Sequence, residues 1–227
     1  MPYTTIIYTK QDHIARITLN RPQANNIINR QLAQELKVIC HAINQDDDIH
    51  VVVATGAGNG AFCGGSDLEH GSAEYNVATA IASIDRPVIA VINGDALGQG
   101  LELALSCDIR LTSHQARFGF PQVSQELIPM DGGTQTLPRI IGRSTALGVL
   151  LTGRWVRAEE ALRLKLVNHV MPGDELLPTT ERLAKRIGDY DPVAVSFAKQ
   201  AITRGLDMSL DEGLKLEARL GACISSS

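Results

Sequence analysis

The chain has 227 residues, of which 44% are hydrophobic and 20% charged, so it can bury a core and fits one globular domain with a helical appendage. A net charge of −4 gives no basic patch, which argues against nucleic acid as the main ligand. No apolar run reaches the roughly 18 residues of a membrane span, and the first residues lead into a strand-like segment instead of a leader, so we expect a cytoplasmic protein without membrane contacts.

The first part of the chain predicts a strand-rich N-terminus. Residues 4–10 and 13–20 are rich in β-branched side chains and are separated by Gln11 and Asp12, which indicates a β-hairpin. Apolar residues recur at helical spacing from Arg30 to Asn44, and Val51–Thr55 is typical of a buried strand. A strand, a helix and a strand therefore follow one another.

Glycine-rich loops come next, at residues 56–60 and 64–65. A helix is expected over residues 74–84 and a buried strand over residues 88–92. This alternation predicts a mostly parallel sheet with helices outside it.

The last third is expected to be helical from Arg143 onward. No linker is long enough to separate two independent domains. The expected helices are Thr145–Thr152, Ala158–Leu164, Glu175–Ile187, Pro192–Arg204 and Leu210–Ala222.

Residues 87–108 carry the most chemical information. An apolar strand runs into Gly94, Gly98 and Gly100, which let the backbone approach a ligand, and the helix start that follows offers N–H groups to a developing anion. Glu102 stands between leucines, where burial would raise its pKa towards a value useful for proton transfer. The alternative is a first-turn glutamate that favours the helix dipole and points to water.

Cysteine and histidine positions predict neither disulfides nor a metal site. The histidines are dispersed, and the cysteines lack the paired spacing of a disulfide framework or a zinc site. We therefore expect four free thiols, at Cys40, Cys63, Cys107 and Cys223.

Three separated segments together resemble the crotonase, or enoyl-CoA hydratase/isomerase, superfamily in the expected order over nearly the whole chain. They are Leu19–Asn26, Gly60–Leu68 and Gly98–Asp108, the last followed by Phe118–Gln122 and Pro129–Gln135. The resemblance implies an α/β fold with a crotonase-like ββα spiral core in residues 1–142. A C-terminal α-helical region in residues 143–227 would serve oligomerisation and pocket closure.

The same resemblance implies an oxyanion hole made of the Ser66 and Gln99 N–H groups, which would receive the thioester oxygen as it becomes an enolate. Such donors are worth roughly 3–4 kcal/mol each in the transition state. Gln99 replaces the middle glycine of the three that the family usually has, so its side chain must be accommodated near the thioester. Further substrate contacts are expected at Ala24, Gly64, Gly65, Asp67, Leu68 and Gly98.

Hydratases of this family use two glutamates, and this chain matches only the first of them, Glu102. Gln122 stands at the second position, and its amide can orient a water but cannot exchange a proton. Asp131 matches the position of a functional aspartate in other relatives and is a candidate second acid/base. The alternative is that Asp131 caps the helix that follows it, which is worth ~1 kcal/mol.

The resemblance therefore implies an enzyme that acts on an acyl-CoA thioester through an enolate, most simply an enoyl-CoA hydratase or isomerase. Coenzyme A would enter as part of the substrate, with no metal or other cofactor, and the protein would assemble as a homotrimer or hexamer. Two alternatives stay open. One is another enolate reaction, namely acyl-CoA hydrolysis, C–C bond cleavage or decarboxylation. The other is a catalytically weakened acyl-CoA-binding protein of the same fold.

Overall fold

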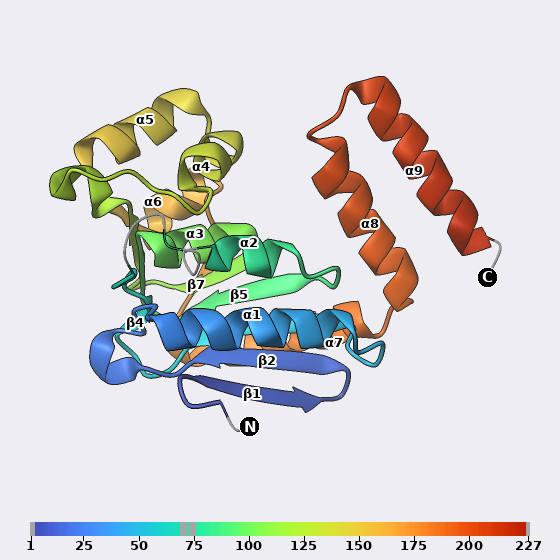
Figure 1. Cartoon of the computed structure of the whole chain (residues 1–227), viewed down its shortest axis with the longest axis horizontal. Helices are drawn as coiled ribbons and strands as arrows, with labels where there is room; N and C mark the ends of the chain where they lie inside the picture. The colour runs from blue at the N-terminus through green and yellow to red at the C-terminus, as the bar shows by residue number, and fades with distance from the viewer. Residues whose placement is uncertain (1–2, 69–71, 73–75, 226–227) are drawn as a thin grey trace.

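A six-stranded sheet forms the centre of the computed structural model, which describes residues 3–68, 72 and 76–225 (Figure 1). Its neighbouring strands are parallel except for the N-terminal hairpin, which confirms the predicted mostly parallel sheet. In spatial order the strands are β1 (Ile6–Gln11), β2 (Ile14–Leu19), β3 (Val51–Gly56), β5 (Val88–Ile92), β7 (Ile109–Ser113) and β10 (His169–Met171).

The hairpin turn lies one residue later than predicted. Gln11 pairs with Ile14, so the two turn residues are Asp12 and His13. Their φ angles are 52° and 62°. Two successive positive φ angles are the backbone of a type I′ turn, whose twist matches that of the strands it joins. Composition alone placed the turn at Gln11 and Asp12, because the preference for positive φ is weaker at histidine than at asparagine or glycine.

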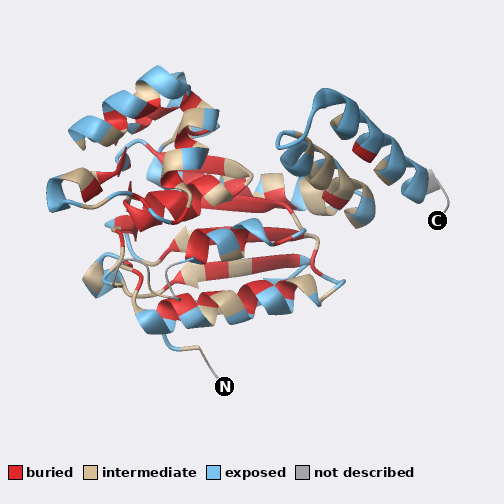
Figure 2. Cartoon of the chain, turned by 45° about the horizontal axis from the view of Figure 1, so that its top comes forward, coloured by how far each residue is buried: buried red, intermediate tan, exposed pale blue. Residues whose placement is uncertain are grey.

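Helices cover both faces of the sheet, and the residues of β3 alternate between them. Val52 and Ala54 pack in the core beneath α1 (Arg30–Asn44), α2 (Val77–Ala82) and α3 (Gln99–Ser106). Val51 and Val53 pack with Leu176 of α7 (Gly173–Gly188) on the other face. Figure 2 shows this buried centre. α2 is shorter than the helix predicted over residues 74–84, of which residues 74 and 75 lie outside the described residues.

A second, four-stranded sheet was not predicted. Its strands are only two or three residues long, too short for any hydrophobic period to appear. Three of them follow closely after strands of the large sheet and so extend the chain beyond its carboxyl edge. They are β4 (Ala61–Cys63), β6 (Asp95–Leu97), β8 (Arg117–Gly119) and the antiparallel β9 (Val156–Arg157).

The helices predicted after Arg143 are confirmed, but this region also contains β9 and β10, which were not expected. β10 completes the large sheet beside β7. Short 3-10 turns lie at η1 (Pro22–Ala24) and η2 (Pro121–Gln125). The remaining helices are α4 (Gly133–Ile141), α5 (Arg143–Thr152), α6 (Ala158–Arg163), α8 (Pro192–Gly205) and α9 (Leu210–Ser225).

Figure 1 shows α8 and α9 as a separate helix pair beside the body of the molecule. Polar contacts of Lys199, at the middle of α8, fix the pair to the body. Lys199 Nζ lies 2.8 Å from Asp108 Oδ2 and 2.9 Å from the carbonyl oxygen of Arg86. Among the described helices, none has the length and apolar character needed to cross a membrane.

Candidate active site

The start of α3 packs against the end of β4, and two glycines make this possible. Gly98 adopts a φ of +53°, which side chains rarely tolerate. A Cβ at Gly100 would overlap with the carbonyl oxygen of Cys63. The predicted need for glycine at the strand-to-helix turn therefore has a physical basis at both positions.

The segments that hold Ser66 and Gln99 lie against each other. Ser66 forms an isolated parallel bridge with Ile28, in which Ile28 donates to the carbonyl of Gly65 and accepts from Asp67. In a parallel ladder of this kind, the N–H of Ser66, which lies between Gly65 and Asp67, points away from Ile28. A Cβ at Gly65 would lie 3.6 Å from the carbonyl oxygen of Leu97. Gln99 opens α3, where amides have no intrahelical acceptor.

The side chain of Gln99 is buried and held by a specific partner. Its Nε2 donates to Asp131 Oδ2 over 3.1 Å. The sequence left open how a side chain fits beside the thioester at this position. In the fold it is accommodated by pairing with Asp131.

Glu102 is a buried carboxylate, with 2% of its surface exposed. Its Oε1 accepts hydrogen bonds of 2.8 Å from the main-chain nitrogens of Asp131 and Gly133. Burial, reinforced by the charge of Asp131 and opposed by those two hydrogen bonds, raises the pKa of Glu102 to about 7. Within residues 3–68, 72 and 76–225, its Oε2 has no hydrogen-bond partner. The alternative of a solvent-facing first-turn glutamate is wrong.

Asp131 does not cap the helix that follows it. The N-cap of α4 is Gly132, and no side chain caps that end. The Asp131 carboxylate instead reaches the first turn of α2. It accepts from the main-chain nitrogens of Ala78 (2.7 Å) and Thr79 (3.3 Å) and from Thr79 Oγ1 (3.2 Å). Burial raises the pKa of Asp131, and these hydrogen bonds oppose that effect. The alternative of a cap on the following helix is wrong, because the partners of the carboxylate lie more than fifty residues earlier in the sequence.

Gln122 lies over Gly98. Its Nε2 is 3.2 Å from the position that a Cβ on Gly98 would take. The side chain is buried, and in the described part of the chain its Oε1 has no hydrogen-bond partner. Gln122 thus stands beside the start of α3 with an acceptor available.

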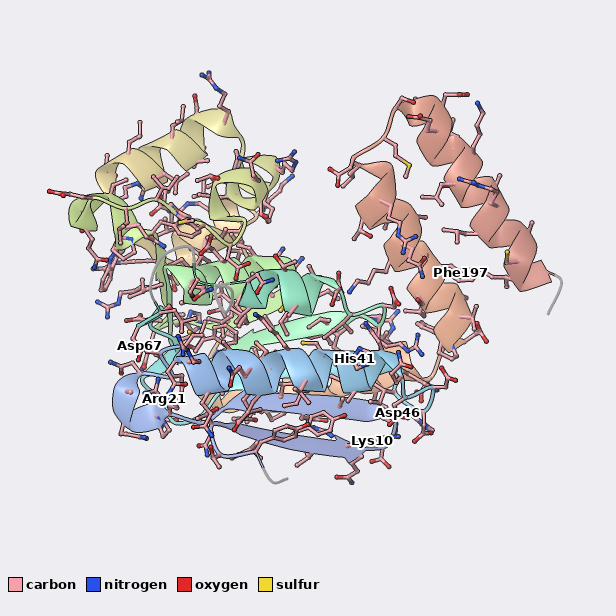
Figure 3. The ribbon with its side chains drawn as sticks, viewed as in Figure 1. Lys10, Arg21, His41, Asp46, Asp67 and Phe197 are labelled. Atoms are coloured by element: carbon pink, nitrogen blue, oxygen red, sulfur yellow. The ribbon has the colours of Figure 1, made fainter. Side chains whose placement is uncertain are left out.

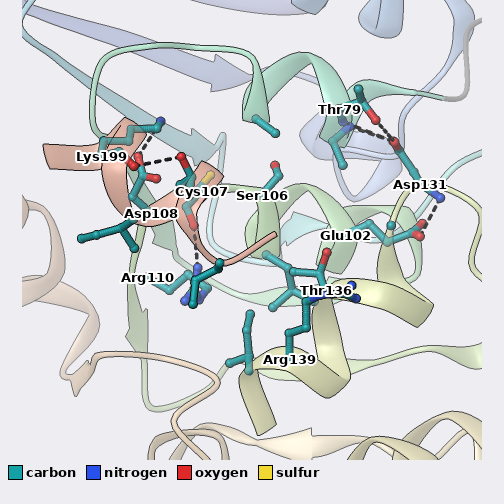
Figure 4. Close-up of a pocket in the computed structure, with 18 of the residues that line it drawn as sticks. Thr79, Glu102, Ser106, Cys107, Asp108, Arg110, Asp131, Thr136, Arg139 and Lys199 are labelled. Carbon is teal, nitrogen blue, oxygen red and sulfur yellow. Dashed lines mark hydrogen bonds and ion pairs between the residues drawn. The ribbon is translucent and has the colours of Figure 1, made fainter. Parts of the chain in front are cut away.

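A cavity of about 660 Å³ runs between α2, α3, α4 and α8, a size suited to a small-molecule group (Figure 4). Glu102 and Asp131 line one end of it, and Asp108, Arg110 and Lys199 line the other. Ser66 and Gln122 are not among its lining residues.

The other predicted contact residues surround the turn after β2. Ala24 ends η1, and the carbonyl oxygen of Asn25 accepts from Gly64 over 2.9 Å. Arg21 Nη1 lies 3.8 Å from Asp67 Oδ2, a pair that is labelled in Figure 3. Leu68 packs partly buried against the core. The structure therefore brings the first two predicted segments together.

Asn26 contributes to this turn in a way that was not predicted. It is fully buried, and its Nδ2 donates to the carbonyl oxygens of Ala57 (3.0 Å) and Ala61 (2.8 Å). Its φ of 54° is a conformation that asparagine tolerates better than most residues. The sequence signal that could have predicted this turn is the pair Asn25 and Asn26, which follows Pro22 closely.

Comparisons with known proteins show the family to which the chain belongs. The family model described as enoyl-CoA hydratase/isomerase matches residues 9–226. YngF of Bacillus subtilis is 42% identical over 95% of this chain and 88% of its own length. The short-chain-enoyl-CoA hydratase of Clostridium acetobutylicum is 37% identical over 100% of this chain and 92% of its own.

A solved structure extends the likeness to three dimensions. The crystal structure of an enoyl-CoA hydratase from Bacillus anthracis superposes with a TM-score of 0.94 at 34% identity, and the match covers 99% of this chain and 92% of that one. The two short glycine-bearing segments, the buried glutamate and these likenesses together lead to one conclusion. The chain is an enzyme with the crotonase fold and belongs to the enoyl-CoA hydratase/isomerase family.

Proposed function

We propose that the protein acts on an enoyl-CoA thioester with Glu102 as its acid/base. The observation that carries this proposal is the environment of Glu102. One carboxylate oxygen is fixed by two main-chain N–H groups, the other has no partner among the described residues, and the pKa is raised to about 7. A group that titrates near neutrality both accepts and returns a proton efficiently.

The Ser66 and Gln99 N–H groups are proposed as the oxyanion hole. Their segments touch. The bridge to Ile28 directs the Ser66 N–H away from Ile28, and the Gln99 N–H lies at the first residue of α3. Negative charge develops on the thioester oxygen as the enolate forms, and each preorganised donor stabilises it by roughly 3–4 kcal/mol. Coenzyme A enters as part of the substrate, near Ala24, Gly64, Gly65, Asp67, Leu68 and Gly98, and no further cofactor is proposed.

Hydration is the first candidate reaction. Gln122 Oε1 accepts a hydrogen bond from water, and Glu102 removes a proton from that water as its oxygen bonds to the β-carbon. The thioester oxygen then carries the enolate charge. Glu102 returns the proton to the α-carbon, which completes the addition of one water molecule. A single carboxylate therefore performs both transfers.

Isomerisation is the second candidate, and Gln122 is the observation that favours it. An amide cannot exchange protons at neutral pH, so it does not replace the second glutamate of a hydratase. Double-bond migration needs only one acid/base. Glu102 would remove an α-proton from a 3-enoyl-CoA and return it at the γ-carbon of the dienolate.

Assembly into a homotrimer or hexamer is proposed on the basis of α8 and α9. Ile202, Leu206, Leu210 and Leu214 expose between 54% and 82% of their surface in the single chain. Contact with further copies would cover this apolar surface. Light scattering on the purified protein is expected to give the mass of three or six chains. The mass of one chain would contradict the proposal.

The experiment that tests the function uses crotonyl-CoA, a 3-enoyl-CoA and butyryl-CoA in D₂O, followed by NMR and mass spectrometry. We expect hydration of crotonyl-CoA or migration of the 3-enoyl double bond, together with exchange of α-protons. Release of free CoA would indicate hydrolysis instead, and CO₂ released from malonyl-CoA or a shortened acyl group formed from a 3-oxoacyl-CoA in parallel assays would indicate decarboxylation or C–C cleavage. Binding of all three thioesters without exchange would indicate an acyl-CoA-binding protein.

A further inference from the structure

Asp131 connects three parts of the site through two different groups. Its main-chain N–H donates to Glu102 Oε1 over 2.8 Å. Its carboxylate holds the first turn of α2 through Ala78 and Thr79, and it accepts from the side-chain amide of Gln99. The acid/base, the first residue of α3 and the start of α2 therefore meet at one residue.

The carboxylates of Glu102 and Asp131 differ in how many of their lone-pair positions accept hydrogen bonds from the protein. An ionised carboxylate offers about four lone-pair positions. Asp131 Oδ2 accepts from Ala78 N and Gln99 Nε2, and Oδ1 accepts from the nitrogen and the hydroxyl of Thr79. All four positions are therefore engaged within the protein. An acid/base must direct a lone pair or a proton at its substrate, and Asp131 has none to spare.

We propose that Asp131 is a positioning residue and not the second acid/base, and that Asp131 and Gln99 form a clamp that fixes Glu102 relative to the start of α3 and to α2. The inference rests on the proposed function, in which Glu102 transfers the proton. It also explains why glutamine fits where the family usually has glycine, because the longer side chain supplies the clamp with a donor.

Asp131→Asn separates the two roles. The amide oxygen can take the place of Oδ2 and keep the bonds from Ala78 and Gln99, while the new NH₂ group donates to Thr79 Oγ1. Only the 3.3 Å contact with the Thr79 nitrogen is lost. The clamp survives this change, but any proton transfer by residue 131 does not. Asp131→Ala removes the clamp as well.

We expect Asp131→Asn to keep kcat within about tenfold of wild type, whereas loss of a true acid/base lowers it by a factor of about 10²–10⁴. The limb of the kcat/KM profile that reports Glu102 should remain and move to lower pH, because the charge of Asp131 raises the pKa of Glu102. The other charged groups lining the cavity stay in place in this variant: Asp108, Arg110, Arg139, Lys199 and Asp207.

Asp131→Ala should lower kcat further than Asp131→Asn does. Asp191 provides the matched control, because its carboxylate also caps a helix, accepting from Ala194 over 2.7 Å at the start of α8. Asp191→Asn and Asp191→Ala are expected to leave kcat and the pH profile unchanged. A fall of 10²-fold or more in Asp131→Asn, with loss of a limb, would overturn the inference while leaving the proposed function intact.

Amide hydrogen exchange tests the clamp without any substrate. The N–H group of Ala78 should exchange faster in Asp131→Ala than in wild type and remain protected in Asp131→Asn. The N–H group of Thr79 should exchange faster in both variants, because both lose its contact with Oδ1. Unchanged exchange in Asp131→Ala would contradict the clamp. If wild type proves inactive on all three thioesters, the proposed function fails, and this measurement still decides whether the clamp exists.

Discussion

The main-chain nitrogen of Gly133 lies 2.8 Å from Glu102 Oε1, and this contact depends on the absence of a side chain at Gly133. A Cβ there would lie 3.0 Å from Oε1 and 2.8 Å from atoms of both Phe120 and Pro129. The start of α4 therefore comes close enough to hold the carboxylate only because residue 133 is glycine.

Gly133→Ala should displace Glu102 and overpack its surroundings. We expect a loss of about 1–3 kcal/mol in the free energy of unfolding and a fall in kcat of about tenfold or more. Gly148→Ala is the control, since a Cβ in that helix meets nothing within 4 Å and alanine favours helix. Urea unfolding and initial rates measure both effects. Equal behaviour of the two variants would contradict the tight contact.

Glu102→Gln should abolish most of the activity. The amide retains the shape and the two main-chain hydrogen bonds but cannot transfer a proton, so kcat should fall by a factor of about 10²–10⁴. Binding of butyryl-CoA, measured by calorimetry, should persist. Glu126→Gln, at the exposed end of η2, serves as the control and should behave as wild type. Retention of activity in Glu102→Gln would remove Glu102 from the mechanism.

The same substitution should stabilise the protein at high pH. The pKa of Glu102 is raised from 4.5 to about 7, so the folded state binds more protons and its stability falls as pH rises through this window. Above about pH 7, the buried ionised carboxylate lowers the free energy of unfolding by about 3 kcal/mol, whereas a neutral glutamine does not lower it in this way. Unfolding measured near pH 5 and pH 8 should show Glu102→Gln gaining stability over wild type only at the higher pH. If wild type were instead more stable than Glu102→Gln near pH 8, ionised Glu102 would stabilise the fold, which would contradict the raised pKa.

Gln122→Glu introduces the second carboxylate of a two-glutamate hydratase. Because Gln122 is buried beside Gly98, we expect hydration of crotonyl-CoA to rise by about tenfold or more relative to isomerisation, at some cost in stability. Gln125→Glu adds the same charge on the exposed side of η2 and should change neither reaction. Product ratios by NMR give the answer. An unchanged ratio would show that position 122 does not touch the reacting water.

Much of the fold could be predicted from the sequence, because the long helices and strands show clear hydrophobic patterns. α1 extends over the predicted residues 30–44, and β5 over the predicted residues 88–92. The strands of the small sheet and β10 escaped prediction, because pairs and triplets of residues carry no period. They exist because neighbouring strands supply hydrogen-bond partners.

Part of the candidate site could also be predicted from the sequence. The burial of Glu102 could be predicted from the leucines beside it, and the glycine requirement from Gly98 and Gly100. The partners of Asp131 could not be predicted. Its acceptor role toward Ala78 and Thr79 spans residues more than fifty positions apart and exists only after α2, α3 and α4 have packed.

The position of β10 has a consequence for synthesis of the chain. β10 pairs with β7, and the α7 helix that follows it covers Val51, Val53 and Val91 on one face of the sheet. Until residues 169–188 have left the ribosome, β7 presents an unpaired edge and that apolar face lacks its cover. Such surfaces promote aggregation. Ribosome-bound chains that end before β10 should therefore depend on chaperones more strongly than chains that extend beyond α7.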